Sequence, residues 1–230
     1  MKLQTPLTIL TFVVMLAALY AIFIYAPTEL TMGVVQRIFY FHVSSDWISF
    51  LAIFFAAIYS ILFLIKGERE LDVKAAAAFE VGSIFCTLGI ISGMIWAKPV
   101  WGIWWTWDPR LTSMFVLWLI YIGYLMLRRF LESPEQRARL SAVFGILGAV
   151  DVPIVYMSNR WWRTQHPQPV MGGGESSGLD PKMRIAFFLA LAAFTLFYLY
   201  LWKIRCQLEQ TAETVETLQR QIEIRLKEAR

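Results

Sequence analysis

The stretch WGIWWTWDPR, residues 101–110, separates two long apolar runs near the middle of this 230-residue chain. It holds four tryptophans, one aspartate and one arginine. Tryptophan is enriched at membrane–water boundaries because its ring is amphipathic, but anchoring a helix end takes only one or two rings. Four rings in one connection therefore predict a platform for a large, flat and apolar ligand.

The apolar runs on either side predict a membrane protein. Hydrophobic residues make up 58% of the chain and charged residues 17%, whereas an ordinary soluble domain holds about 25% charged residues. A hydrocarbon core of about 30 Å needs roughly 20 apolar residues per helix. Six runs approach that length: residues 7–25, 47–65, 79–96, 111–127, 140–157 and 185–202. We therefore expect an all-α membrane protein with six transmembrane helices.

The distribution of Lys and Arg predicts the orientation. If the N-terminus is cytoplasmic, about two thirds of these residues fall on the cytoplasmic side, as the positive-inside rule requires. Most of the bias comes from the residues after Trp202. We predict cytoplasmic N- and C-termini and a membrane domain over residues 1–203, with an outer loop at residues 97–110.

The C-terminal segment, residues 204–230, differs sharply in composition from the rest of the chain. Its apolar residues recur every three or four positions, which is typical of an amphipathic helix: Leu208, Ala212, Val215, Leu218 and Ile222. We expect a short cytoplasmic helix that contacts a partner subunit.

Only two histidines occur, His42 and His166. In the predicted topology they lie in the first and third outer loops, beside the tryptophan-rich second loop. Neutral imidazole is a common axial ligand of haem iron, and aromatic rings stack against the apolar faces of a porphyrin. A single loop histidine is more often only solvated or hydrogen-bonded. Composition and spacing alone therefore predict a flat cofactor on the outer face, and haem is the best candidate for it.

Three motifs, in order, carry a resemblance to a known family. They are MGVVQRIFYFHV at residues 32–43, GIWWTWDPRLTS at residues 102–113 and NRWWRTQHP at residues 159–167. The chain resembles the heme exporter protein C (CcmC) family of c-type cytochrome maturation, within the WWD-domain haem-handling superfamily, from Tyr25 to Trp202. One departure is the proline after His166, where the family more often has glutamine.

The resemblance implies a bacterial inner-membrane protein that holds b-type, non-covalently bound haem on its periplasmic face. His42 and His166 would be the axial ligands of the haem iron, and the tryptophan-rich loop would contact the porphyrin. The implied partners are a haem chaperone (CcmE-like), ABC transporter subunits (CcmA/CcmB-like) and a small membrane subunit (CcmD-like), with no nucleic acid. The chain would deliver haem and would not be an enzyme, beyond a lyase-like assistance in attaching haem to the chaperone.

Individual residues of the tryptophan-rich loop receive more specific predictions. Trp104, Trp105 and Trp107 are the better candidates for porphyrin contact, whereas Trp96 and Trp101, near the end of the third span, have plain interfacial anchoring as their alternative role. Arg110, before Arg37, is the first choice to bind the haem propionates. Alternatively, these arginines extend toward lipid headgroups.

The aspartates admit structural alternatives. Asp108 precedes Pro109, and Asp180 precedes Pro181, as an N-cap precedes the first helical position. Asp108 therefore has two open roles, in the ligand site and in capping. Similarly, Ser45 or Asp46 is expected to cap the second span, which would leave His42 just outside that helix.

Inside the spans, Asp151 lies two residues before Pro153, either as a functional group or as a partner for backbone groups freed by the proline. Gly89 and Gly93 form a GxxxG step that predicts close helix packing. The run GGGESSG, residues 172–178, predicts a mobile link. Because no histidine is expected within a span, a permease that moves haem through its own helices is the less favoured alternative.

Overall fold

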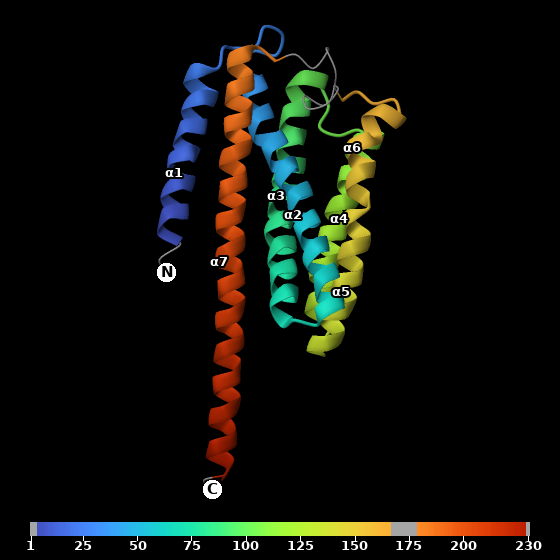
Figure 1. Cartoon of the computed structure of the whole chain (residues 1–230). Helices are drawn as coiled ribbons and strands as arrows, with labels where there is room; N and C mark the ends of the chain where they lie inside the picture. The colour runs from blue at the N-terminus through green and yellow to red at the C-terminus, as the bar shows by residue number, and fades with distance from the viewer. Residues whose placement is uncertain (1–3, 167–178, 229–230) are drawn as a thin grey trace.

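The computed structural model describes residues 4–166 and 179–228. These residues form an all-helical bundle with no β-strand (Figure 1). The helices are α1 (Gln4–Tyr20), α2 (Ile38–Lys66), α3 (Arg69–Trp101), α4 (Pro109–Phe130), α5 (Pro134–Ala149), α6 (Asp151–Trp161) and α7 (Pro181–Glu228). A π-helical turn, Ala21–Tyr25, extends α1, and a 3-10 turn, Val34–Arg37, leads into α2.

The six predicted transmembrane helices are confirmed. Six segments are long and apolar enough to cross a membrane: Thr5–Tyr25, Val34–Lys66, Arg69–Trp101, Pro109–Phe130, Pro134–Trp161 and Pro181–Ala212. The fifth span consists of α5 and α6, which are separated at Val150. This break lies three residues before Pro153, where the proline ring and its missing N–H interrupt the helical ladder.

The predicted position of His42 in a loop is wrong. The second span begins before Trp47, because α2 starts at Ile38, and His42 lies inside the helix. Ser45 does not cap a helix; its hydroxyl donates to Phe41 O, 2.8 Å away, within the same helix. The polar residues that lower the hydropathy of this stretch, among them Ser45 and Asp46, are buried inside the bundle.

Capping side chains and left-handed glycines set several helix ends. Asp180 Oδ1 accepts from the Lys182 amide at 2.8 Å, which confirms the predicted cap of α7. Asp108 caps α4, and Ser133 Oγ accepts from the Gln136 amide at the start of α5. The helix α3 ends at Gly102, whose φ of 77° suits a residue without a side chain.

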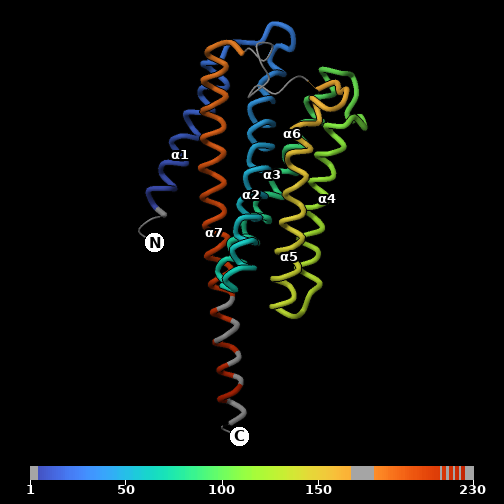
Figure 2. The backbone as a smooth tube through the Cα atoms, turned by 45° about the vertical axis from the view of Figure 1, so that its right-hand side comes forward, coloured from blue at the N-terminus to red at the C-terminus, as the bar shows by residue number. Residues whose placement is uncertain are grey.

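The helices pack around the antiparallel pair α2 and α3, which make the most extensive contact in the bundle. The helices α4, α5 and α6 lie on one side of this pair, and α1 and α7 lie on the other (Figures 1 and 2). Residues 26–33, 102–108 and 162–166 gather at one end, called the loop end below. The helix α1 begins, and α7 ends, on the side away from the loop end.

A buried ion pair joins α3 to α4 on the side away from the loop end. Arg128 Nη1 lies 2.6 Å from Asp72 Oδ1, and Nη2 lies 3.1 Å from Oδ2. The Asp72 side chain is 2% exposed, and Arg69 also pairs with it. Because the contact is bidentate, it fixes the orientation of the two helices as well as neutralising both charges.

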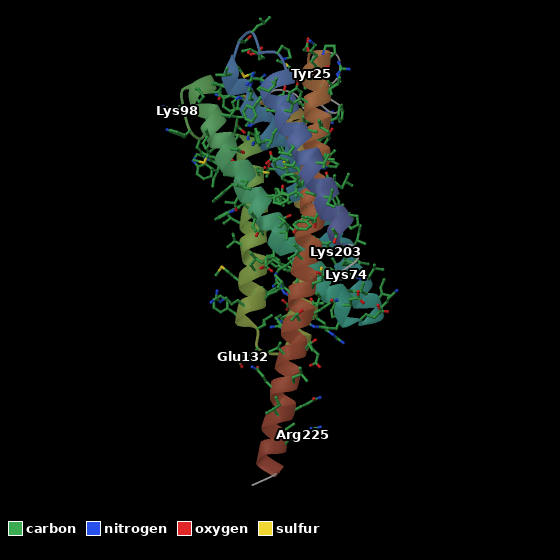
Figure 3. All side chains as sticks on the ribbon, turned by 90° about the vertical axis from the view of Figure 1, so that its left-hand side faces the viewer. Tyr25, Lys74, Lys98, Glu132, Lys203 and Arg225 are labelled. Atoms are coloured by element: carbon green, nitrogen blue, oxygen red, sulfur yellow. The ribbon has the colours of Figure 1, made fainter. Side chains whose placement is uncertain are left out.

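The predicted C-terminal helix is present but is continuous with the last span. The helix α7 runs for 48 residues without a break and extends well beyond the rest of the bundle, as the position of Arg225 in Figure 3 shows. Leu208, Val215 and Leu218 on this extension are exposed. The predicted mobile link, residues 172–178, lies outside the described residues.

Candidate functional site

The imidazole ring of His42, on α2, is held by the backbone of α3. Its Nδ1 lies 2.9 Å from the Gly89 carbonyl oxygen. Because a carbonyl only accepts, Nδ1 carries a proton, so in the neutral form of the ring the lone pair is on Nε2. The ring also meets Trp96 edge to face, with 5.8 Å between centroids. The side chain is 13% exposed, and its Nε2 lies 3.7 Å from Asp46 Oδ2.

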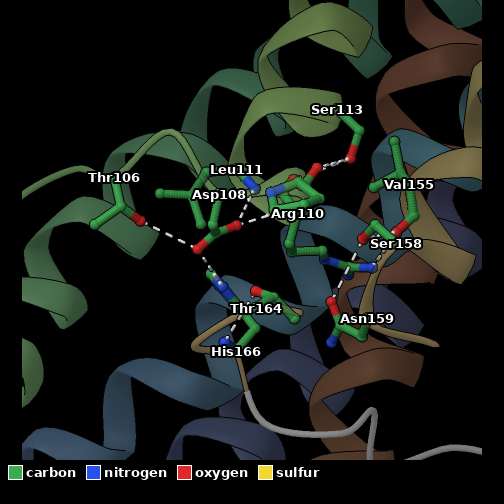
Figure 4. A network of polar contacts seen from close by, with 11 residues as sticks. Thr106, Asp108, Arg110, Leu111, Ser113, Val155, Ser158, Asn159, Thr164 and His166 are labelled. Carbon is green, nitrogen blue, oxygen red and sulfur yellow. Dashed lines mark hydrogen bonds and ion pairs between the residues drawn. The ribbon is translucent and has the colours of Figure 1, made fainter. Parts of the chain in front are cut away.

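His166 is placed by the segment that follows α6. Its Nδ1 lies 3.7 Å from Asp108 Oδ2, and its side chain is 21% exposed. Its ring meets Trp101 edge to face at a centroid distance of 5.0 Å, and its amide donates to Thr164 Oγ1 at 3.1 Å. Figure 4 shows His166 below Asp108, facing the start of α4. Each histidine therefore has one tryptophan and one aspartate beside it.

Asp108 serves α4 and His166 with different oxygens. Oδ1 accepts from the amides of Arg110 and Leu111, at 2.9 and 3.0 Å. Oδ2 faces His166 and accepts from Thr106 Oγ1 at 3.1 Å. Burial alone would raise the pKa of Asp108, but His166 and the Leu111 amide outweigh it and hold this pKa at about 2. Asp108 is thus ionised, and the predicted capping role is confirmed.

Arg110 interacts with α6 and with the charges of two aspartates. Its Nη1 donates to the Val155 carbonyl of α6 at 2.6 Å (Figure 4), and its charge interacts with both Asp46 and Asp108. The guanidinium therefore feels the charges of the aspartates beside both histidines. Arg37 differs, because its Nε is buried without a hydrogen-bond partner among the described residues. Its guanidinium lies 5.9 Å from the centroid of the Phe23 ring.

The tryptophan-rich loop divides into exposed and packed rings. Trp104 is 53% exposed and Trp107 is 72% exposed. Trp105 is partly buried, packing edge to face on Trp107 and on Phe115 of α4, with centroid distances of 5.5 and 6.1 Å. Two rings of this loop are therefore available for a ligand, and the third orders the loop.

The structure brings some residues to the site that sequence reasoning did not assign to it. Trp96 and Trp101, for which interfacial anchoring was the alternative, contact the two histidines. Asp46, expected to be a cap, faces His42. The position of the two tryptophans near the end of the third apolar run was the only sequence signal for their contacts. Asp46 lies four residues after His42 on the same face of α2, but this spacing gave no signal while the stretch was expected to lie outside the helix.

Comparison with known proteins gives consistent results. Residues 1–221 match the sequence model of the family described as heme exporter protein C. The chain is 35% identical to heme exporter protein C of Bradyrhizobium diazoefficiens, over 84% of this chain and 74% of the relative. It is 33% identical to a putative cytochrome c biosynthesis ccmC-like mitochondrial protein of Marchantia polymorpha, over 77% and 75%. It is 29% identical to heme exporter protein C of Escherichia coli K12, over 75% and 69%.

Proposed function

Because the chain belongs to the heme exporter protein C family, we propose that it holds haem at the loop end and presents it to a haem chaperone. In this proposal, His42 and His166 are the two axial ligands of the haem iron. The loop end faces the periplasm, both termini are cytoplasmic, and residues 1–203 form the haem-handling domain. The chain is a delivery component for cytochrome c maturation and works with ABC transporter subunits and a small membrane subunit.

One observation carries the proposal: both histidines rest against tryptophans of the same helix. His42 contacts Trp96 from α2, and His166 contacts Trp101 from the segment after α6. Trp96 and Trp101 lie near the C-terminal end of α3. Two imidazoles that reach one helix end from separate segments suit a ligand with one metal between two open faces, as in haem.

The donor set fits haem iron. When His42 Nδ1–H donates a hydrogen bond to the Gly89 carbonyl, Nε2 of the neutral ring has a lone pair available for iron. Metal-binding histidines commonly donate their second ring N–H in this way. The exposed faces of Trp104 and Trp107 offer apolar surface for the porphyrin. Arg37, whose Nε has no partner within residues 4–166 and 179–228, and Arg110 remain the candidates for the propionates.

The position of His42 inside α2 bears on the alternative function, a haem permease. A permease that passes haem through its own helices was disfavoured because no histidine was expected in a span, yet His42 lies inside α2. The chain nevertheless has only two histidines, and both lie beside the loop end. A hydrocarbon core of about 30 Å would need further ligands to relay the iron across it. Presentation at one face remains the better proposal.

The test is the absorption spectrum of the detergent-purified protein, expressed with a supply of haem. We expect a haem Soret band in the wild type that shifts or disappears in both His42→Ala and His166→Ala. Arg129→Ala, an exposed residue at the far end of α4, controls for handling and should match the wild type. A Soret band unchanged in both histidine variants would overturn the proposal.

A further inference from the structure

The GxxxG step of α3 meets α2 at His42 and Asp46. From this geometry we infer that Gly89 and Gly93 are positioning residues for His42: the Gly89 carbonyl fixes the ring tautomer, and the missing side chain of Gly93 leaves room for the ring. The inference rests on the proposed function, because it concerns how the first haem ligand is held. The pair is thus more than a packing motif, which is all that its spacing predicts.

At Gly93 the neighbour is the imidazole itself. A Cβ added at this position would lie 2.9 Å from His42 Cε1, 3.3 Å from Nδ1 and 3.7 Å from Nε2. Carbon atoms in ordinary contact stay at about 3.5 Å or more. An alanine at Gly93 would therefore push the ring away from α3 and away from the Gly89 carbonyl.

At Gly89 the backbone and the missing side chain both matter. The carbonyl accepts from His42 Nδ1, and a Cβ on the same residue would overlap Asp46 Oδ1. Asp46 is only 8% exposed, and its Oδ1 has no hydrogen-bond partner among the described residues. Burying a carboxylate oxygen without a partner costs stability. Packing of two apolar helix faces would not require a carboxylate here, so the contact of Asp46 with Gly89 beside His42 is more than simple helix packing.

The hydrogen bond has a consequence for ligation. A neutral imidazole holds one proton, and the Gly89 carbonyl selects Nδ1 for it. Iron would then bind at Nε2. Ser92 lies beside this contact: its Oγ is 3.4 Å from Nδ1 and donates to the Leu88 and Gly89 carbonyls, at 2.6 and 3.0 Å.

The first test uses haem-free protein, so it does not depend on haem binding. The protein is labelled with 15N-histidine, and the two histidine signals are assigned with His166→Ala. At mildly alkaline pH we expect His42 in the wild type to carry its proton on Nδ1. Observing the proton on Nε2 would overturn the inference without any glycine variant, including the case in which those variants fail to fold.

The second test compares glycine variants. Gly93→Ala should shift His42 away from the Nδ1–H tautomer and change the Soret band of the haem-loaded protein. Gly123→Ala is the matched control, because its added Cβ would meet only the Phe144 ring at 3.1 Å, between α4 and α5. A Gly93→Ala protein with wild-type tautomer and Soret band would contradict the inference.

A double variant separates positioning from general packing. If Gly93 acts through His42, Gly93→Ala should add no further change to the Soret band when His42 is already alanine. An additional change of similar size in that background would show a packing role and overturn the inference. If His42→Ala itself leaves the Soret band unchanged, the proposed function fails, and the tautomer measurement still decides the role of Gly89 and Gly93.

Discussion

Asp108 lies 3.7 Å from His166 with one carboxylate oxygen while the other oxygen caps α4. A single side chain therefore ties the position of a proposed haem ligand to the first turn of a transmembrane helix. The two alternatives that the sequence left open for Asp108 are thus compatible, because they use different oxygens.

Replacing Asp108 should affect stability and haem together. We expect Asp108→Ala to lower the free energy of unfolding by about 1 kcal/mol through loss of the cap and to weaken the Soret band. Ser133→Ala is the matched control, since it removes the cap of α5 far from His166. Thermal unfolding and haem titration measure the two effects. Equal Soret bands in the two variants would show that Asp108 has no role in holding His166 for haem.

The pH dependence follows from the same carboxylate. The pKa of Asp108 is about 2, below its ordinary value of 3.8, so the folded protein binds this proton more weakly than the unfolded chain. The ionised group therefore stabilises the fold at pH values above 3.8, and this contribution is lost as the pH falls from 3.8 toward 2. Unfolding of wild type and Asp108→Asn should differ near neutral pH and converge at low pH. A difference independent of pH would contradict this assignment.

The two classes of tryptophan should respond differently to substitution. Trp104 is exposed, so Trp104→Ala should weaken haem binding roughly 3- to 10-fold, the value of one aromatic contact, with little change in stability. Trp105 packs on Trp107 and Phe115, so Trp105→Ala should also destabilise the protein by about 1 kcal/mol. Haem titration and thermal unfolding of both variants make the comparison. Equal stability losses would refute the division of the loop.

The ion pair between α3 and α4 should be a major source of stability. Asp72→Asn leaves the guanidinium of Arg128 without its partner carboxylate in a buried setting, which typically costs about 3 kcal/mol or more. We expect a lower yield of folded protein and a lower unfolding temperature. Arg129→Ala, next to Arg128 but exposed, serves as the control and should unfold like the wild type.

Removing residues 213–230 should leave the haem site intact. The contacts that fasten α7 to the bundle, such as Arg205 Nε to Glu80 Oε2 at 2.6 Å, lie before this segment. We expect an unchanged Soret band and reduced co-purification of the ABC transporter subunits, because Val215 and Leu218 are exposed. Full recovery of the complex would dispose of the proposed contact between this tail and a partner.

Much of the fold was predictable because it depends on local composition. Long apolar runs identified all six spans, and the Asp–Pro pairs at Asp108 and Asp180 marked two helix starts. The continuity of α7 was missed because composition changes after Trp202 although the helix does not end there. Where a helix passes from apolar to polar surroundings, the change in composition resembles the end of the helix.

The site was predictable by residue type but not by contact. The two histidines and the tryptophan-rich loop were identifiable, yet the polar residues from His42 to Asp46 resembled a loop and its cap. Within α2, His42 and Asp46 lie against Gly93 and Gly89 of α3, where no side chain blocks them. Such complementarity between distant segments follows from tertiary packing, which no single segment of sequence encodes.

The uninterrupted α7 has a mechanical consequence. At 1.5 Å per residue, its 48 residues span about 72 Å, more than twice the thickness of a hydrocarbon core of about 30 Å. After Pro181 the helix contains neither proline nor glycine, so it has none of the usual points of bending. A tilt of about 5° around its midpoint would displace each end by about 3 Å. A partner that binds the C-terminal part of α7 and tilts it therefore also moves the other end of the helix, near Pro181, across the membrane.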